Sequence, residues 1–192
     1  MKVLSQAFNR KNIGWGQIPR PLQIFLLRGI CTLIVWKALY LFVFLPLHQP
    51  DHALSYATAS ATTWVFKLLS PAMQPVLYPE QDMLITAVVH GTRINTIMIA
   101  DACNALELMV LFAGFVLCVP APLRKQLKYV SVGILVIFIA NVFRCLALNY
   151  IYISFPDFFA FAHHYLFTLT IYFIIFLLWK RFMKEWITYA KK

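Results

Sequence analysis

Apolar residues gather in four long stretches of the chain, separated by shorter polar or basic segments. The stretches cover residues 24–47, 104–119, 129–152 and 165–179. An α-helix needs about 20 consecutive apolar residues to cross the roughly 30 Å hydrocarbon core of a bilayer. The pattern therefore predicts an all-α integral membrane protein whose core is a bundle of about four transmembrane helices.

Two segments between the first and second stretches depart from this pattern. Residues 54–69 are rich in Ala, Ser and Thr and only weakly hydrophobic, so we expect an outer interfacial helix there rather than a span. Residues 83–103 hold two β-branched runs around His90 and Gly91, which is typical of a short extracytoplasmic β-hairpin. Together these segments predict a cap over residues 48–102.

Composition and charge agree with a membrane protein and suggest its topology. The chain of 192 residues is 61% hydrophobic and 12% charged, whereas soluble domains carry about 25% charged residues. Its net charge of +10 comes from basic clusters before the first stretch, between the second and third, and after the last. Such clusters mark cytoplasmic helix ends, so we expect both termini on that side and no binding of nucleic acid. A span at 54–69 would place the 124–128 loop outside, against this rule.

Charged residues inside the apolar stretches are costly and normally face other helices. Lys37 lies near the middle of the first stretch, and we expect it to face the bundle. Arg144 has two compatible interpretations: a structural ion pair with Glu107, or a chemical role. Asn141 shares a helix face with Arg144 and is expected to donate an interhelical hydrogen bond.

Under this topology a thiol, a guanidinium and two imidazoles come to one depth of the membrane. Cys103 lies at the outer end of the second stretch, and Arg144 lies eight residues before the outer end of the third. His163 and His164 immediately precede the fourth. We expect Asp101 to cap the second helix, which would place Cys103 in a first turn where the helix dipole favours a thiolate.

These groups suit acyl transfer. A thiolate is a strong nucleophile, and a histidine can take the thiol proton and return it to the leaving group. A fixed positive charge in a low dielectric can stabilise the thiolate or an oxyanion. The pattern leaves open whether His163 or His164 is the acid/base. Because the two histidines are adjacent and no HExxH occurs, the sequence predicts no metal, and it predicts no cofactor.

Three blocks of the sequence resemble the exosortase/archaeosortase family of membrane transpeptidases. The stretch ACNAL at 102–106 resembles the nucleophile motif, an Ala-Cys-Ser-Gly-like stretch at the start of a transmembrane helix. The stretch NVFR at 141–144 resembles an Asn-x-x-Arg motif, and AHH at 162–164 resembles the histidine motif. The resemblance covers about residues 83–180 in order and spacing.

The chain departs from the family pattern at two of these blocks. Asn104 and Ala105 replace the usual Ser-Gly after the cysteine, and a second histidine stands where the family usually has an acidic residue. The chain also lacks the extra N-terminal spans of longer members, so it resembles a compact bacterial-type branch.

The resemblance implies an enzyme that cleaves the C-terminal sorting signal of exported proteins at the outer face of a bacterial cytoplasmic membrane. By position, Cys103 would be the nucleophile, Arg144 the stabiliser of the thiolate or oxyanion, and His163 or His164 the acid/base. The residues expected to support them are Asn104, Glu107, Asn141 and Asp101.

The resemblance also implies the partners and the division of the chain. The partners would be membrane lipids, an unknown acceptor lipid or glycan, and membrane-anchored substrates whose signal combines a short motif, a hydrophobic helix and a basic tail. Residues 1–192 form a single membrane domain, with 1–23 as a cytoplasmic segment and 103–192 as the catalytic helices and cytoplasmic tail.

Two other classes of function remain open from the sequence. The chain could be a non-enzymatic subunit or scaffold of a secretion or polysaccharide-export system, with Cys103 as packing and Glu107–Arg144 as a structural ion pair. A transporter fragment is less favoured, because the sequence shows no repeat and no pair of helices broken by Gly or Pro. The enzyme requires Cys103, Arg144 and a histidine to converge in an open pocket, whereas the scaffold requires no such pocket.

Overall fold

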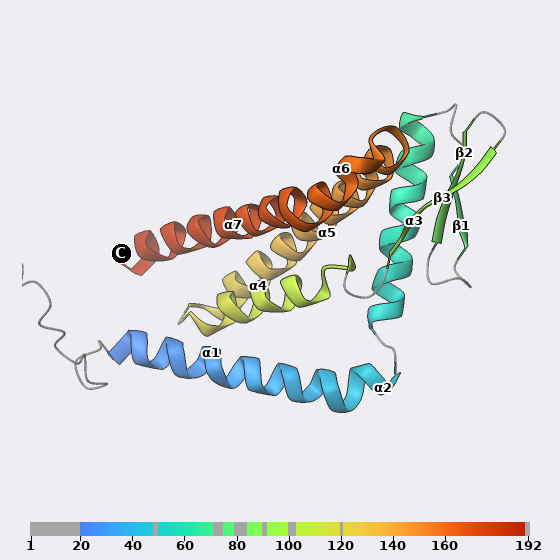
Figure 1. Cartoon of the computed structure of the whole chain (residues 1–192). Coiled ribbons are helices and arrows are strands. Elements are labelled where there is room, and N and C mark those ends of the chain that lie inside the picture. The colour runs from blue at the N-terminus through green and yellow to red at the C-terminus, as the bar shows by residue number, and fades with distance from the viewer. Residues whose placement is uncertain are drawn as a thin grey trace, which may run out of the picture.

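The chain folds into long helices with a small antiparallel sheet at one end (Figure 1). The computed structural model describes residues 20–47, 50–70, 75–78, 84–89, 92–99, 103–119 and 121–190. The helices are α1 Arg20–Leu39, η2 Tyr40–Phe44, α2 Leu45–Leu47, α3 Asp51–Leu69, α4 Leu106–Cys118, α5 Leu123–Ser154, α6 Pro156–Phe161, η4 Ala162–Leu166 and α7 Phe167–Ala190. The strands are β1 Val76–Tyr78, β2 Leu84–Val89 and β3 Thr92–Met98. The start of α1 and the end of α7 lie at the end of the molecule opposite the sheet (Figure 1).

Three helices are long and apolar enough to cross a membrane. They run over Gln23–Leu47, Leu123–Ser154 and Pro156–Glu185, and they make candidate spans of the stretches predicted at 24–47, 129–152 and 165–179. The fourth prediction holds only in part. Helix α4 has 13 residues, so it is about 20 Å long and shorter than the roughly 30 Å hydrocarbon core.

The end of α4 is closed by a side chain of the next helix. Its last carbonyls have no partner within the helix. The Nε2 of the buried Gln126 of α5 lies 3.0 Å from Val116 O, 3.3 Å from Leu117 O and 2.7 Å from the O of Val119, the residue after the helix. Because the free carbonyls are satisfied in this way, the chain can turn directly from α4 into α5.

Helix α3 lies across the ends of α1, α4 and α5 rather than beside them (Figure 1). It confirms the helix expected at 54–69, and it is not among the helices long and apolar enough to span. Its buried face is lined mainly by small and hydroxyl side chains, including Ser55, Thr58 and Thr62. If the long helices cross the bilayer, this crosswise orientation places α3 along the membrane surface.

The mainly helical class holds, but the β-structure is larger than predicted, because it is a three-stranded sheet rather than an isolated hairpin. The predicted hairpin is present, with β2 antiparallel to β3 from Leu84↔Met98 to Val89↔Thr92. Its turn residues, His90 and Gly91, lie outside the described residues. The additional strand β1 pairs with β2, which gives the order β1-β2-β3.

The sheet packs against the side of α3 and the end of α5 (Figure 1). Buried Ile85 and Ile97 share an apolar cluster with Cys145 and Leu148 of α5. The Thr96 hydroxyl lies within hydrogen-bond distance of Asn149 Oδ1, and Asn149 Nδ2 donates to Cys145 O at 3.0 Å. Apolar packing and a buried polar contact therefore both attach the sheet to α5.

A second apolar core joins α4, α5 and α7. Phe112 of α4 is fully buried in it, beside Ile137 of α5 and Ile171 and Ile175 of α7. Gly133 of α5 faces this core, where an added Cβ would lie 2.0 Å from the Phe112 ring. Glycine at this position therefore lets α5 approach the aromatic ring closely.

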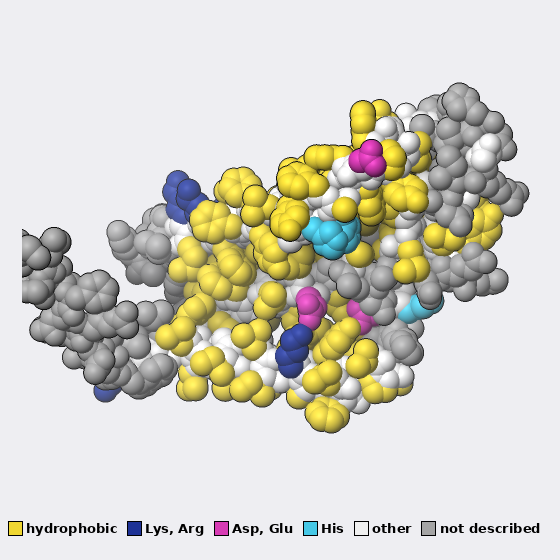
Figure 2. All heavy atoms as spheres, viewed as in Figure 1, with side chains coloured by type: hydrophobic (Ala, Val, Ile, Leu, Met, Phe, Trp, Pro, Cys, Tyr) yellow, Lys and Arg dark blue, Asp and Glu magenta, His cyan; other side chains and the backbone are white. Residues whose placement is uncertain are grey.

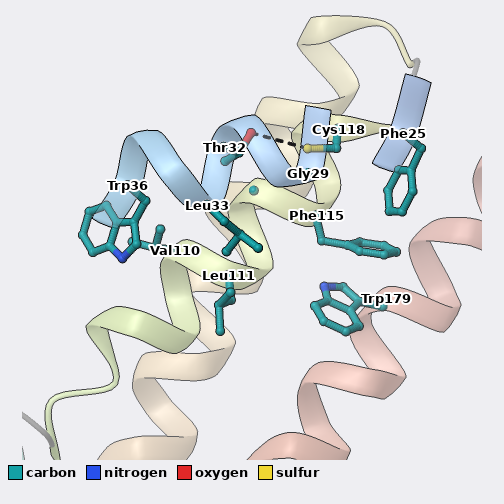
Figure 3. Close-up of a pocket in the computed structure, with 11 residues that line it drawn as sticks. Phe25, Gly29, Thr32, Leu33, Trp36, Val110, Leu111, Phe115, Cys118 and Trp179 are labelled. Carbon is teal, nitrogen blue, oxygen red and sulfur yellow. Dashed lines mark hydrogen bonds between the residues drawn. The ribbon is translucent and has the colours of Figure 1, made fainter. Parts of the chain in front are cut away.

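Helix α1 packs against α4 along one face and exposes most of its other side chains (Figure 3). Thr32 contacts Cys118, with 3.6 Å between Oγ1 and Sγ, where Gly114 permits a close approach. Phe115 stacks on Trp179 of α7, with 4.4 Å between ring centroids. These aromatic rings border an apolar cavity of about 170 Å³ between the three helices.

Large hydrophobic side chains cover much of the outer surface of the long helices (Figure 2). Phe42 is 80% exposed and Leu169 is 74% exposed. Soluble monomers rarely expose apolar patches of such extent. The exposed surface therefore fits helices that are surrounded by lipid.

We predict that Gly133→Ala lowers the free energy of unfolding by about 1–3 kcal/mol, the usual cost of overpacking a core. The reason is that the new methyl group must displace the enclosed Phe112 ring. Thermal unfolding of the purified protein in one detergent, followed by circular dichroism, measures the change.

The matched control is Gly29→Ala in α1, where an added Cβ meets nothing within 4 Å. This change should leave stability unaltered or raise it by about 0.5–1 kcal/mol, because alanine favours the helix. Equal shifts in both variants would contradict the packing described here.

Candidate active site

Cys103 lies in a short turn that precedes α4. The helix begins at Leu106 because Ala105 adopts a left-handed backbone conformation, with φ 65° and ψ 15°. Such a conformation is uncommon for any residue except glycine. The expectation that Cys103 lies in the first helical turn was therefore wrong. Asp101, which was expected to cap that turn, lies outside the described residues.

Asn104 fixes this turn to the start of α3. Its side chain is 1% exposed, and its Nδ2 donates to Asp51 Oδ1 at 2.9 Å and lies 3.2 Å from Ser55 Oγ. Its Oδ1 accepts a hydrogen bond from the Leu106 N–H at 2.9 Å. One buried amide therefore satisfies the first N–H of α4 and ties the turn to α3.

Asn141 holds the same turn from α5. Its Nδ2 donates to Cys103 O at 2.9 Å, and its side chain is fully buried. The expected role of Asn141 as a hydrogen-bond donor is confirmed, with a carbonyl of the turn as the acceptor. Its Oδ1 lies 3.5 Å from Arg144 Nη1, one helical turn further along α5. The Cys103 turn is therefore held from two helices.

The π-helical turn η4 brings a histidine to the thiol. His163 Nε2 lies 3.9 Å from Cys103 Sγ. The His163 ring stacks on Phe159, and the His164 ring meets it edge-on with 5.0 Å between centroids. The sequence pattern could not separate the two histidines, whereas the structure places His163 next to the thiol.

A cavity of about 530 Å³ collects these groups. Its lining includes Cys103, Arg144, His163 and His164, together with the buried Asp51. These residues come from the turn before α4, from α5, from η4 and from the start of α3. The cavity therefore joins a thiol, a guanidinium and two imidazoles whose residues are far apart in the sequence.

Arg144 and Glu107 do not form the structural ion pair considered from the sequence. Glu107 pairs instead with Lys37 of α1, with 2.7 Å between Oε1 and Nζ. This pair links α1 to α4, but both side chains are about 60% exposed, so Lys37 does not lie inside the bundle as the sequence predicted. The buried Nε of Arg144 has no hydrogen-bond partner in the described part of the chain. Among the described residues, the guanidinium therefore lines the cavity without a carboxylate partner of its own.

The four cysteines have different surroundings. Cys145 and Cys118 are buried among apolar side chains, and Cys31 is exposed on α1. Cys103 is partly exposed and is the cysteine that lines the polar cavity. A partly exposed thiol beside an imidazole and a guanidinium has the surroundings typical of a reactive cysteine.

A comparison with models of protein families matches residues 23–180 to the transmembrane exosortases of the EpsH type. The chain belongs to the transmembrane exosortase family. Searches of curated proteins and of solved structures found no match. Family membership implies a multi-pass membrane protein with a transpeptidase role in sorting, acting on substrate proteins that carry sorting signals.

Sequence reasoning missed several residues of this exosortase cavity, among them Asp51 and Tyr40. Asp51 is 4% exposed and accepts the Asn104 hydrogen bond, and Tyr40 of η2 forms part of the wall. The sequence offers one indication for Asp51: it follows Pro50 at the start of a weakly hydrophobic segment, where an acidic residue favours the beginning of a helix. Nothing local distinguishes Tyr40 from the other aromatic residues of the first span.

We predict that Asn104→Ala lowers the free energy of unfolding by about 1–3 kcal/mol, the cost of leaving buried polar groups unsatisfied. The buried Asp51 carboxylate and the first N–H of α4 both lose a partner in this variant. Thermal unfolding in detergent measures the effect.

Ser131→Ala is the comparison variant, because it removes an exposed hydroxyl that donates to Leu127 O within α5. Its effect should stay within about 0.5 kcal/mol, as for most surface substitutions. If Asn104→Ala is equally mild, the asparagine does not hold the turn.

Proposed function

We propose that this chain is a membrane-embedded cysteine transpeptidase that cleaves the C-terminal sorting signal of exported proteins through a thioester on Cys103. The observation that carries the proposal is the 3.9 Å separation of Cys103 Sγ and His163 Nε2, in a cavity that Arg144 also lines. Family membership supports the reaction class, and the geometry supports this choice of residues.

We further propose that this site faces the outside of a bacterial cytoplasmic membrane. The basic segment 124–128, expected from the sequence to be a loop, forms the start of α5 and lies beside the end of α7, since Lys125 and Lys128 line one cavity together with Arg181. Both regions lie at the end opposite the sheet, where α1 begins (Figure 1). The positive-inside rule assigns that end to the cytoplasm, so α3 and the sheet would form the outer cap.

In the first step, His163 Nε2 takes the thiol proton while Cys103 Sγ attacks the carbonyl carbon of the scissile peptide bond. The carbonyl electron pair moves to oxygen and gives a tetrahedral oxyanion. Arg144 would stabilise this oxyanion, as a positive charge whose Nε has no competing partner in the described structure. A separation of 3.9 Å without substrate is compatible with a base that moves closer on binding.

In the second step, the oxyanion collapses and the peptide C–N bond breaks. The His163 imidazolium returns its proton to the leaving amine, and the hydrophobic segment departs with its basic tail. An acceptor nucleophile from a lipid or a glycan then loses a proton to His163 and attacks the thioester. The Cys103 sulfur leaves and recovers that proton, and with water as acceptor the same steps make the enzyme a protease.

The substrate helix would approach the cavity from the side of the bilayer. The wall of the cavity includes Tyr40 of η2, Leu111 of α4 and Tyr172 of α7. Around it, the outer faces of α1 and α7 carry exposed hydrophobic side chains (Figure 2). A hydrophobic segment beside this rim could present a peptide bond at its outer end to Cys103.

We predict that Cys103→Ala abolishes substrate processing, because the thioester cannot form. The experiment replaces the chromosomal gene and compares exported proteins by mass spectrometry of their C-terminal peptides. Precursors that retain a hydrophobic segment and basic tail should accumulate in the membrane.

Cys145→Ala is the matched control, because Cys145 lies in the same region but is buried among apolar side chains. Processing should continue in this variant. If both variants process normally, Cys103 has no part in the reaction. If both fail while remaining in the membrane, the cysteines act through packing, as the scaffold interpretation requires.

We also predict that the two histidines differ. His163→Ala should lower processing by about 10²-fold or more, as expected for loss of a general base, whereas His164→Ala should have a smaller effect. The alkylation rate of Cys103 by a membrane-impermeant maleimide in intact cells gives a second readout, with the other three cysteines replaced.

This labelling should be fast in the parent and in His164→Ala, and several-fold slower in His163→Ala. Equal and small losses for the two histidines would exclude the proposed base. Labelling that requires an opened membrane would reverse the proposed topology.

A further inference from the structure

A second charged cavity lies at the opposite end of the bundle, between the start of α5 and the end of α7. It has a volume of about 580 Å³, and we name it the α5–α7 groove. Its polar lining residues are Lys125, Lys128, Tyr129, Arg181 and Glu185. The catalytic steps proposed for Cys103 use none of these side chains, and the groove shares no lining residue with the Cys103 cavity.

Three cations from two helices meet in this groove. Lys125 and Lys128 lie three residues apart and so share one face of α5, whereas Arg181 belongs to α7. Glu185 is the carboxylate in the lining, and its Oε1 lies 3.3 Å from Arg181 Nε. That ion pair is exposed and therefore weak. The groove retains an excess of positive charge and would attract an anion.

Beyond the cations the groove becomes apolar. Val132, Val136 and Leu178 line it, and Val136 also lines a cavity of about 570 Å³ that continues between α5 and α7 towards Arg144. The helix rises about 12 Å from Lys128 to Val136, close to half of the roughly 30 Å hydrocarbon core. The apolar part thus has the depth of one membrane leaflet.

We propose that the α5–α7 groove binds one anionic membrane lipid. The headgroup phosphate would lie between Lys125, Lys128 and Arg181, and an acyl chain would follow Val132 and Val136 towards the bilayer centre. Basic pockets between membrane helices are known to suit anionic headgroups.

The charge of the groove decides between this occupant and a substrate helix. A sorting signal that ends in a basic tail would be repelled by Lys125, Lys128 and Arg181. An anionic lipid complements the net positive charge of the lining and the apolar wall together. This inference does not depend on the chemistry proposed for Cys103.

The test uses the purified full chain in detergent, stripped of lipid and then exposed to phosphatidylglycerol or phosphatidylcholine. Native mass spectrometry should show one phosphatidylglycerol retained per chain in preference to phosphatidylcholine. The double variant K125Q/K128Q should weaken that retention by about ten-fold or more, since each basic residue contributes to headgroup attraction. Equal retention of the two lipids would overturn the proposal.

The matched control R124Q/K180Q removes the same charge from the same end of the protein, at residues that do not line the groove. It should retain phosphatidylglycerol as the parent does. Equal loss in both double variants would show diffuse attraction rather than a site, and would overturn the proposal.

A third variant tests the apolar part of the groove. Val136→Trp keeps every charge but fills the path of the acyl chain, so it should also weaken retention. Unchanged retention in this variant would overturn the proposed path of the acyl chain. Displacement of the lipid by millimolar inorganic phosphate would overturn the proposal of a lipid site, because the groove would then bind phosphate alone. Circular dichroism of each variant verifies that a loss of lipid is not a loss of fold.

Discussion

Two buried asparagines hold the turn that carries Cys103, and the rest of the candidate site depends on them. Asn104 ties the turn to α3 through Asp51, and Asn141 ties it to α5 through the Cys103 carbonyl. A non-helical segment in or near a bilayer needs internal partners for its backbone groups. These two amides supply such partners. Because Asn141 and Arg144 lie on the same helix, the bond from Asn141 also fixes the position of the cysteine relative to Arg144.

The interior of the molecule has two regions that differ in polarity. Around the turn, the interior is polar, with buried Asp51, Asn104 and Asn141, and Asn149 is buried further along α5 at the sheet. The other core joins α4, α5 and α7 and is almost entirely apolar, with Phe112 at its centre. Buried polar residues are expensive in a membrane protein and usually mark its functional region. The distribution of buried polar groups therefore agrees with the cavity at Cys103 as the place where chemistry occurs.

Hydrophobicity along the sequence predicted the long helices because burial in lipid depends mainly on local composition. It also predicted the β2–β3 hairpin from β-branched runs. Three features were not predicted, each for its own reason. The partner of Glu107 comes from the distant helix α1. The start of α4 depends on the left-handed backbone of Ala105, and β1 has only three residues, which is too short for a recognisable pattern. The motifs identified the reactive side chains and their order along the chain. They could not show which of the two adjacent histidines lies next to the thiol. Their different positions arise from the winding of η4.

That winding makes the site sensitive to the number of residues in the chain as well as to their identity. A π-helical turn accommodates one residue more than an α-helical turn, and such turns often persist at functional sites. Removing one residue from Ala162–Leu166 would restore regular α-helical phase without shortening the span appreciably. Because the wide turn absorbs that residue, α6 and α7 would keep nearly the same relative orientation, and the change would fall on the turn that carries His163 and His164. Single-residue insertions and deletions here should be far less tolerated in evolution than hydrophobic exchanges along the lipid-facing side of α7.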